Sequence, residues 1–231
     1  MYLLLDIGNT RCKAAIYEKG NLHLVSDLNT IKSNYQPIKK VIVSCVAADS
    51  KVQLIKNQLN YLEIPWVYVY AEKTAFGLIN SYINPEKLGV DRWLAMIAAK
   101  KMFDNQDLLV IDAGTAVTFD WIDQQGNHQG GWILPGIRLQ QHAVVSNTDK
   151  VINEDNFMAK LLPATNTSSA LQNGCLAAIV GAIHMAWQTK RVSKIILTGG
   201  DSNLFSEHLA QLPVVIEPLL IFKGLSCYCP H

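Results

Sequence analysis

The chain has 231 residues, of which 49% are apolar and 17% are charged, and its formal net charge is +1. A chain of this length can bury a substantial core, as one large domain or two small ones. The balanced charge gives neither the basic stripe typical of nucleic-acid binding nor an acidic tail, so we expect no nucleic-acid partner.

Three further features bear on location. The N-terminus leads directly into an apolar run of strand type, without the charged-then-apolar layout of a signal peptide. The apolar stretch 175–187 is shorter than a membrane span and contains His184, so it is expected to be a buried helix. Five scattered cysteines show no metal-ligand spacing and predict no structural disulfide. We therefore expect a cytoplasmic protein with no membrane partner.

The chain begins with the apolar residues 3–5, which predict a buried strand, followed by Asp6 and then Gly8, Asn9 and Thr10. Glycine, asparagine and a hydroxyl residue are typical of a tight turn with outward-facing backbone N–H groups. A carboxylate beside such a turn repels phosphate unless a cation lies between them, so the stretch suggests a metal-bridged nucleotide phosphate. A plain hairpin turn is the alternative.

The same stretch occurs a second time. Residues 109–111 repeat the apolar run, and Asp112, Gly114 and Thr115 repeat the aspartate, the glycine and the hydroxyl. Each copy is followed by a second β-rich segment and by a Gly-Asn pair typical of a hairpin turn, at residues 20–21 and 126–127, so a third strand is expected after each turn. Two related halves, each with an Asp and a donor-rich turn, match the actin-like, sugar-kinase-like ATPase architecture. Two unrelated hairpins are the less favoured alternative.

These observations predict an α/β protein of two related ribonuclease-H-like halves, each a mixed sheet with flanking helices. The polar patch 104–107 separates a helix from the second copy, so we expect the halves to span residues 1–104 and 105–231. Between and after the repeats, the patterns predict strands at 41–46, 65–70, 194–198 and 214–217 and helices at 49–61, 89–102, 170–187 and 219–228. Residues 130–137 are expected to form a glycine-rich loop, which either approaches a ligand or the other half or, the slightly favoured alternative, is a sharp strand-to-helix connection. Residues 165–169 are expected to be an N-cap cluster, with ligand contact as the second alternative.

Four motifs stand in one order along the chain: Asp6-x-Gly8-Asn9-Thr10, Gly89-Val90-Asp91-Arg92, Asp112-x-Gly114-Thr115-Ala116 and Gly130-Gly131-x-Ile133-x-Pro135-Gly136. With Thr198-Gly199-Gly200-Asp201 behind them, they resemble the type III pantothenate kinases of the actin-like superfamily. The resemblance covers nearly the whole chain. It implies phosphorylation of pantothenate to 4′-phosphopantothenate, the first step toward coenzyme A, with ATP and Mg²⁺ and with K⁺ or NH₄⁺ as a monovalent cation.

The resemblance also implies roles for particular residues. The ATP phosphates would be bound by Asp6, Ile7, Gly8, Asn9, Thr10, Arg11, Cys12 and Lys13, and by Gly114 and Thr115. The pantothenate site would be lined by Tyr82, Gly89, Val90, Asp91, Arg92 and Thr167, close to the interface of a homodimer. Asp112 would bind the monovalent cation, and Asp6 would orient Mg²⁺ through water. The glycine turn at 199–200 would lie beside the adenosine.

Phosphoryl transfer requires an acceptor hydroxyl that loses its proton as the new bond forms. Asp91 is the natural general base, because it heads a helix and lies outside both phosphate turns; its alternative role is a helix cap. Arg92 can fix a substrate carboxylate, or it can form a surface ion pair. Two rival functions remain: an actin-like phosphatase acting on nucleotide or polyphosphate, and a non-catalytic accessory factor for transcription.

Overall fold

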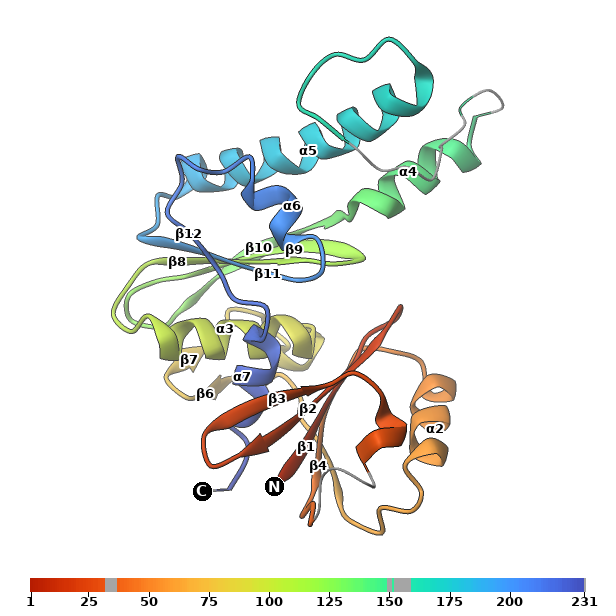
Figure 1. The fold of residues 1–231 in the computed structure, drawn as a ribbon. Helices are drawn as coiled ribbons and strands as arrows, with labels where there is room; N and C mark the ends of the chain where they lie inside the picture. Colours follow the sequence, from red (N-terminus) through yellow and green to blue (C-terminus); the bar gives the residue numbers. More distant parts are fainter. Residues whose placement is uncertain (32–36, 149–150, 152–158, 231) are drawn as a thin grey trace. The chain divides into compact units, whose positions relative to one another are not determined.

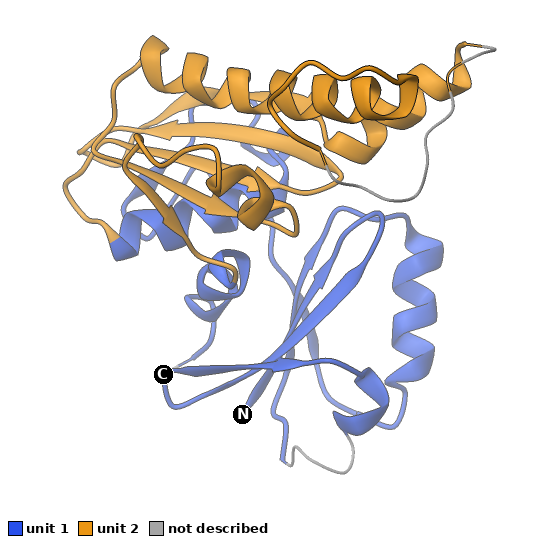
Figure 2. Cartoon of the chain, turned by 45° about the horizontal axis from the view of Figure 1, so that its top comes forward, with its two compact units in different colours: residues 1–102, 219–231 blue, residues 103–218 orange. Residues whose placement is uncertain are grey.

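The computed structural model describes residues 1–31, 37–148, 151 and 159–230. The chain divides into two compact units, which Figure 2 shows in different colours. The first unit comprises Met1–Met102 together with Leu219–His231, and the second comprises Phe103–Pro218.

The first unit is built on a five-stranded sheet with the strand order β3-β2-β1-β4-β5 (Figure 1). β1 is antiparallel to β2 and parallel to β4, so the sheet is mixed. Its strands are β1 (Tyr2–Ile7), β2 (Cys12–Glu18), β3 (Asn21–Val25), β4 (Val41–Cys45) and β5 (Trp66–Tyr68). The remaining elements are the helices η1 (Leu28–Thr30), α2 (Asp49–Gln58), η2 (Pro85–Lys87), α3 (Val90–Met102) and α7 (Leu220–Ser226), and the hairpin of β6 (Thr74–Ala75) and β7 (Leu78–Ile79).

The second unit repeats this sheet with the order β10-β9-β8-β11-β12. β8 is antiparallel to β9 and parallel to β11, as β1 is to β2 and β4. Its strands are β8 (Leu108–Ala113), β9 (Ala116–Ile122), β10 (His128–Pro135), β11 (Lys194–Thr198) and β12 (Val214–Ile216), and its helices are α4 (Ile137–Ser146), α5 (Thr167–Thr189) and α6 (Ser202–Ser206). The equal strand order confirms the expected fold of two related α/β halves.

The apolar pattern of β1 decides which way Asp6 points. Consecutive residues of a strand face opposite sides of a sheet. Leu3, Leu5 and Ile7 pack in the core that α2 covers, together with Ile55. Leu4 packs in the core on the other side, which α3 and α7 supply. Asp6 shares the face of Leu4, so its carboxylate lies on the α3 side of the sheet.

The second unit follows the same rule. Ile111 and Ala113 of β8 pack in one core with the buried side of α5, and Asp112 between them therefore faces the opposite side of the sheet. Residues buried at intervals of three or four line that side of α5: Gln172, Cys175, Leu176, Ile179, Val180, Ile183 and Ala186. α5 is the one helix among the described residues that is long and apolar enough to cross a membrane. Its buried side is that of a core helix, as expected for residues 175–187.

The third strand expected after the Gly-Asn turn at 126–127 is present as β10, but it extends through residues 130–135, where a glycine-rich loop was expected. β10 pairs with β9 from His128 to Pro135, with a register shift between His128 and Gly131. Gly130 has a φ of +95°, a left-handed conformation that favours glycine. The glycines therefore form a bulge inside the strand, and the connection to α4 is reduced to Gly136.

The division into units also differs from the expected one in one segment. Residues 219–231 were expected in the second half, but they belong to the first unit, where α7 packs on α3. Gly224 makes this possible, because a Cβ at that position would lie 2.9 Å from the Cα of Leu94 and closer still to other backbone atoms of Leu94. Such a distance leaves no room for any side chain.

Candidate active site

Asp6 lies at the end of β1 between two polar neighbours. The Ser44 hydroxyl of β4 donates to Asp6 Oδ1 at 3.1 Å, and Lys13 is the register partner of Asp6 on β2. Burial is the main cause that raises the pKa of Asp6 to about 6; the charge of Asp91 raises it further, whereas Ser44 and Lys13 oppose the rise. Mg²⁺ in nucleotide sites is usually held by one or two carboxylates, water and phosphate. The carboxylates of Asp6 and Asp91 repel each other when both are ionised, and a bound cation would relieve this repulsion, so the pair fits Mg²⁺.

The turn after β1 is tight, and Gly8 N–H donates to the Arg11 carbonyl at 3.0 Å. On the other side, the Lys51 ammonium in the first turn of α2 donates to the carbonyls of Gly8 at 2.6 Å and Asn9 at 3.0 Å. Asn9, Thr10 and Arg11 are exposed at the tip of the turn. The exposed tip is therefore the part that is accessible to a phosphate.

Two other members of the expected phosphate set have different surroundings. Ile7 is fully buried in the core on the α2 side, so only its backbone can reach a ligand. Cys12 opens β2, and burial together with the charge of Asp6 raises the pKa of its thiol to about 11, although Lys51 opposes the rise. Cys12 is thus a neutral thiol at neutral pH and is no nucleophile.

Asp91 lies in the first turn of α3, where its Oδ1 accepts from the Arg92 N–H at 2.8 Å. The carboxylate folds back over the start of the helix, because Gly89 has no side chain: a Cβ there would lie 2.6 Å from Asp91 Oδ1. Asp91 therefore accepts a hydrogen bond from the backbone of the first turn of α3. Its charge also acts on Asp6, which brings the second motif beside the first phosphate turn.

Arg92 and Tyr82 form a pair within the first unit. Arg92 is only 6% exposed, so it is not a surface residue, and its Nη1 donates to the Tyr82 hydroxyl at 3.0 Å. The guanidinium carbon lies 5.8 Å from the centroid of the Tyr82 ring. Val90, in contrast, packs its side chain in the core shared with α7 and can offer a ligand only its backbone.

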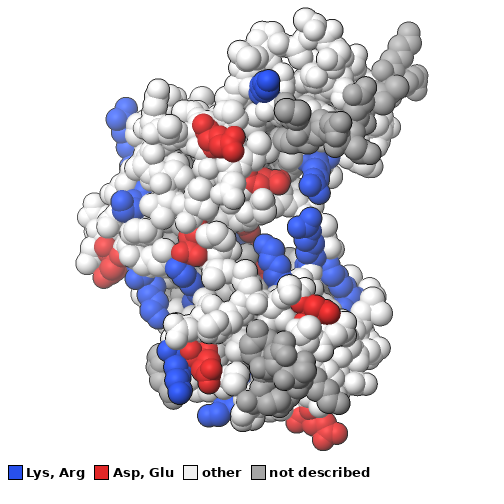
Figure 3. Space-filling model, viewed as in Figure 1, with Lys and Arg blue, Asp and Glu red and all other residues white. Residues whose placement is uncertain are grey.

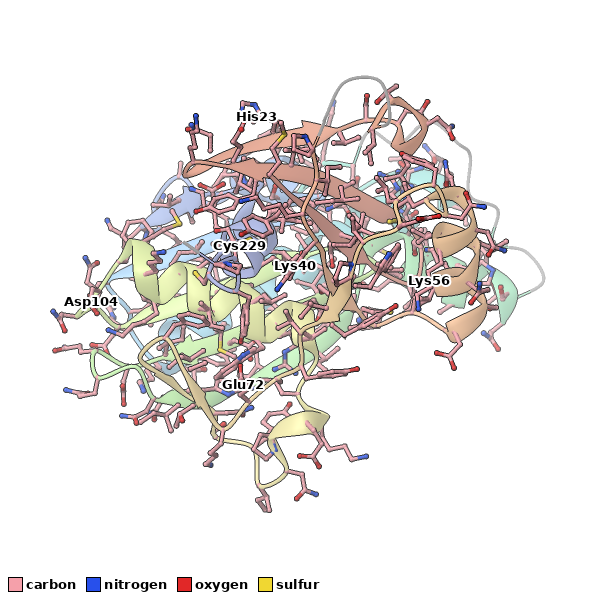
Figure 4. The ribbon with its side chains drawn as sticks, turned by 90° about the horizontal axis from the view of Figure 1, so that it is seen from below. His23, Lys40, Lys56, Glu72, Asp104 and Cys229 are labelled. Atoms are coloured by element: carbon pink, nitrogen blue, oxygen red, sulfur yellow. The ribbon has the colours of Figure 1, made fainter. Side chains whose placement is uncertain are left out.

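Asn80, at the end of the β6–β7 hairpin, fixes the segment that carries Tyr82. Its side chain is fully buried, its Oδ1 accepts from the Tyr82 N–H at 3.0 Å, and its Nδ2 donates to the carbonyls of Glu72 at 3.2 Å and Pro85 at 3.3 Å. Glu72 also accepts a 2.6 Å hydrogen bond from the Tyr228 hydroxyl near the C-terminus. Figure 4 labels Glu72 beside this hairpin.

The second unit presents Asp112, Gly114 and Thr115 at the end of β8. Gly114 N–H donates to the Ala116 carbonyl at 3.0 Å, and Gly136 N–H donates to the Thr115 carbonyl at 2.9 Å. Gly199, with a φ of +94°, lies against this turn: a Cβ there would come within 2.5 Å of Asp112 Oδ1. The glycine turn after β11 is thus directly beside the aspartate at the end of β8.

Thr167 is the first residue of α5 and is exposed. Asn166 is the N-cap of that helix, since its side chain accepts from the Ser169 N–H at 2.8 Å. The polar cluster 165–169 therefore caps the helix, as its sequence predicted.

The first unit brings together most of the residues predicted for the site, at 6–13, 82 and 89–92, and three more that were not predicted: Ser44, Lys51 and Asn80. Each of these is hydrogen-bonded to a residue predicted for the site. Ser44 and Lys51 are 38 and 43 positions away from the residues that they contact, so no local pattern marked them. The one available signal for Asn80 was its position two residues before Tyr82.

Two units with one sheet order, each with an aspartate and a glycine-hydroxyl turn after its first strand, define the actin-like α/β fold. The fold agrees with a solved structure, the activator of the 2-hydroxyisocaproyl-CoA dehydratase from Clostridium difficile with bound ADPNP, at a TM-score of 0.53 and 11% identity over 98% of this chain and 93% of that one.

The type III pantothenate kinase family model matches residues 2–189, and the chain belongs to this family. A type III pantothenate kinase from Pseudoalteromonas translucida is 34% identical over 228 residues, which cover 98% of this chain and 95% of that one. A solved structure from Campylobacter jejuni, described as a proposed Baf family transcriptional activator, is 26% identical with a TM-score of 0.63, covering 97% of this chain and 96% of that one.

Proposed function

We propose that this protein transfers the γ-phosphoryl group of ATP to the hydroxyl of pantothenate and so makes 4′-phosphopantothenate for coenzyme A synthesis. Family membership over the chain supports the reaction. One observation carries the assignment to this site: the Asp91 carboxylate acts on the charge of Asp6, beside the first phosphate turn. An acceptor motif and a phosphate motif, far apart in the sequence, thereby meet in one unit.

The chain's own residues bind and orient the phosphates. The backbone N–H groups of the two glycine turns, with the hydroxyls of Thr10 and Thr115, stabilise the charge on the phosphate oxygens. Lys13 and Arg11 add positive charge near the first turn. Mg²⁺ carried by ATP neutralises the phosphates, and Asp6 would hold it through water.

Asp91 takes the proton from the pantothenate hydroxyl. The carboxylate is fixed in position by the Arg92 N–H and by the space that Gly89 leaves. A base in this position needs to be within hydrogen-bond reach of the hydroxyl that attacks the γ-phosphorus. The proton moves to Asp91 as the new O–P bond forms and the bond to ADP breaks.

Arg92 and Tyr82 bind the acceptor. Pantothenate has a carboxylate at the end remote from its phosphorylated hydroxyl, and a buried guanidinium held by a tyrosine hydroxyl is a rigid donor for such a group. Gly89 and Val90 contribute backbone, and Thr167 contributes its hydroxyl.

Asp112 would hold a monovalent cation, K⁺ or NH₄⁺. The donor set suits a large, weakly hydrated cation, because a carboxylate and several backbone carbonyls of the turn after β8 lie close together. The turn at Gly199, which is in contact with Asp112, takes the adenosine side of the nucleotide.

The protein acts as a homodimer in the cytoplasm. The exposed side of α5 supports a dimer, since it is free of charged residues and mostly small: Ala170, Gly174, Ala177, Ala178, Gly181 and Met185. The exposed Leu161 and Leu162 continue this apolar surface beside the helix. Basic and acidic groups are interspersed over the face that Figure 3 shows, which favours small-molecule substrates over nucleic acid.

The test is a phosphorylation assay with pantothenate and MgATP in K⁺, NH₄⁺ or Na⁺ buffer, with the product identified by mass spectrometry. We expect 4′-phosphopantothenate, formed faster in K⁺ or NH₄⁺ than in Na⁺. Release of inorganic phosphate that is independent of pantothenate would indicate a phosphatase instead. No turnover of either kind, with nucleotide still bound, would favour a non-catalytic role. Equal rates in all three buffers would contradict the proposed requirement for K⁺ or NH₄⁺.

A further inference from the structure

Lys51 is the strongest feature near the site that no sequence motif contains. It lies in the first turn of α2, on the side of the sheet opposite to Asp6 and Asp91. Its ammonium donates to two consecutive backbone carbonyls, Gly8 O at 2.6 Å and Asn9 O at 3.0 Å. Both carbonyls belong to the first phosphate turn, which is 43 and 42 positions away in the sequence.

Because the peptide bond is planar, these two hydrogen bonds also fix the direction of the N–H groups of Asn9 and Thr10. In a trans peptide, the carbonyl of one residue and the N–H of the next point in opposite directions. When Lys51 holds the carbonyls of Gly8 and Asn9 toward α2, the N–H groups of Asn9 and Thr10 must point away from α2. Those are two of the N–H groups that the proposed site uses for phosphate.

The electrostatics favour the same arrangement. A carbonyl oxygen carries a partial negative charge, and a turn that exposed Gly8 O or Asn9 O to ATP would repel its phosphates. The ammonium neutralises both oxygens and adds a full positive charge on the far side of the turn. Its field extends to the neighbouring strand, because Lys51 also opposes the rise in the pKa of the Cys12 thiol.

We infer that Lys51 is a positioning residue for the nucleotide, which holds the first phosphate turn with its N–H groups directed at the phosphates. The inference rests on the proposed nucleotide site. Since the turn binds phosphate in the ground state as well as in the transition state, losing Lys51 weakens ATP binding more than it slows turnover. Hydrogen bonds to a charged phosphate are stronger than those between neutral groups. If the N–H groups of Asn9 and Thr10 are no longer directed at the phosphates, the loss of ATP affinity is therefore large enough to measure.

The variant Lys51→Met keeps the aliphatic stem and removes the ammonium. We expect the KM for ATP to rise about 10- to 100-fold, with kcat changed by less than about threefold and the KM for pantothenate unchanged. Lys51→Arg, which retains the charge and the donors, should restore most of the ATP affinity. Lys56→Met is the matched control: it removes the same charge from α2, where Lys56 lies over Trp66 and Tyr68 and is labelled in Figure 4, and its KM for ATP should equal that of the parent.

Binding measurements separate a role in orienting the turn from a general loss of structure. Calorimetry with a non-hydrolysable ATP analogue should show the same loss of affinity as the KM, whereas the dissociation constant of adenosine, which has no phosphate, should be unchanged when it is measured by calorimetry too. This arm needs no turnover, so it tests Lys51 even if the pantothenate reaction fails. An unchanged affinity of Lys51→Met for the analogue would overturn the inference. Equal weakening of the analogue, adenosine and pantothenate, with a lowered Tm, would overturn it too.

Discussion

The missing side chain at Gly89 leaves the space in which the Asp91 carboxylate lies. We predict that Gly89→Ala lowers kcat about 10- to 100-fold, because a Cβ placed 2.6 Å from Asp91 Oδ1 must displace the carboxylate, and small misplacements of a catalytic group have effects of this size. Gly20→Ala is the contrasting variant. Gly20 has a φ of +88° in the β2–β3 turn, so alanine there should lower the Tm and leave kcat unchanged. Steady-state kinetics and thermal melting of both variants check this; a Gly89→Ala enzyme with normal kcat would contradict it.

Asp6 should have opposite effects on stability and on activity. Its folded pKa of about 6 lies above the ordinary value of 3.8 for an aspartate, so the folded protein favours the neutral acid. The cost of ionising Asp6 is absent at low pH, develops as the pH rises from about 4 to 6, and is complete above that. It amounts to about 1–3 kcal/mol. Asp6→Asn should therefore raise the Tm at pH 8 when measured without nucleotide.

The raised pKa of Asp6 also determines how the activity falls at acidic pH. Only the ionised carboxylate can hold Mg²⁺ through water, so kcat/KM for MgATP should fall as the pH drops below about 6. Asp6→Asn should lose nearly all activity at every pH. A pH profile that is flat from 5 to 8 in the parent enzyme would contradict the assignment of Asp6, as would an active Asp6→Asn variant.

At the scale of elements, the β6–β7 hairpin and the segment after it depend on Asn80. Asn80→Ala removes an acceptor for the Tyr82 N–H and a donor to two carbonyls in a fully buried position. We expect a loss of about 1–3 kcal/mol in the free energy of unfolding and a higher KM for pantothenate, because Tyr82 loses its support. Asn84→Ala is the control, since Asn84 is exposed and caps η2 without a side-chain hydrogen bond. Denaturant titration and kinetics measure both; equal effects at the two positions would refute the role of Asn80.

The elements show which parts of the structure the sequence determines locally. The repeat of Asp6 and Asp112 predicted two equivalent strand-turn-strand units, and the strand orders of the two sheets agree. Helix α3 begins where its motif indicated, within one residue. A third strand was expected after the turn at 126–127, but residues 130–135 were expected to be a loop because glycine and proline are usually breakers, whereas pairing with β9 turns the glycines into a bulge. Tertiary pairing overrides local preference there.

The contacts that assemble the site join residues far apart in the chain, so local sequence patterns could not predict them. Lys51 and Ser44 have ordinary sequence neighbours, and their significance comes from the parallel pairing of β1 with β4, which places the start of α2 behind the phosphate turn. Likewise, the last segment was expected in the second half, since chain order was the one guide available. The close approach of Gly224 to Leu94 joins it to the first unit instead.

At the scale of the whole molecule, the proposed homodimer predicts that a charge on the exposed side of α5 separates the protomers. Ala177→Glu should convert the protein to a monomer, because an unpaired carboxylate would be buried in an apolar interface. Gln53→Glu, which adds the same charge to the exposed side of α2, should leave the dimer intact. Light scattering at micromolar concentration measures both. A parent protein that is monomeric and fully active would remove the dimer from the account.

The most direct test of the catalytic assignment is the kcat of Asp91→Asn with saturating pantothenate and MgATP. The substitution keeps the size of the side chain and an oxygen for the Arg92 N–H but removes the base. General-base contributions are about 10²–10⁴-fold, so we predict a fall in kcat of that order, with nucleotide affinity and Tm close to those of the parent. A near-normal kcat together with about 1 kcal/mol of lost stability would show that Asp91 only caps α3 and would contradict its role as the base.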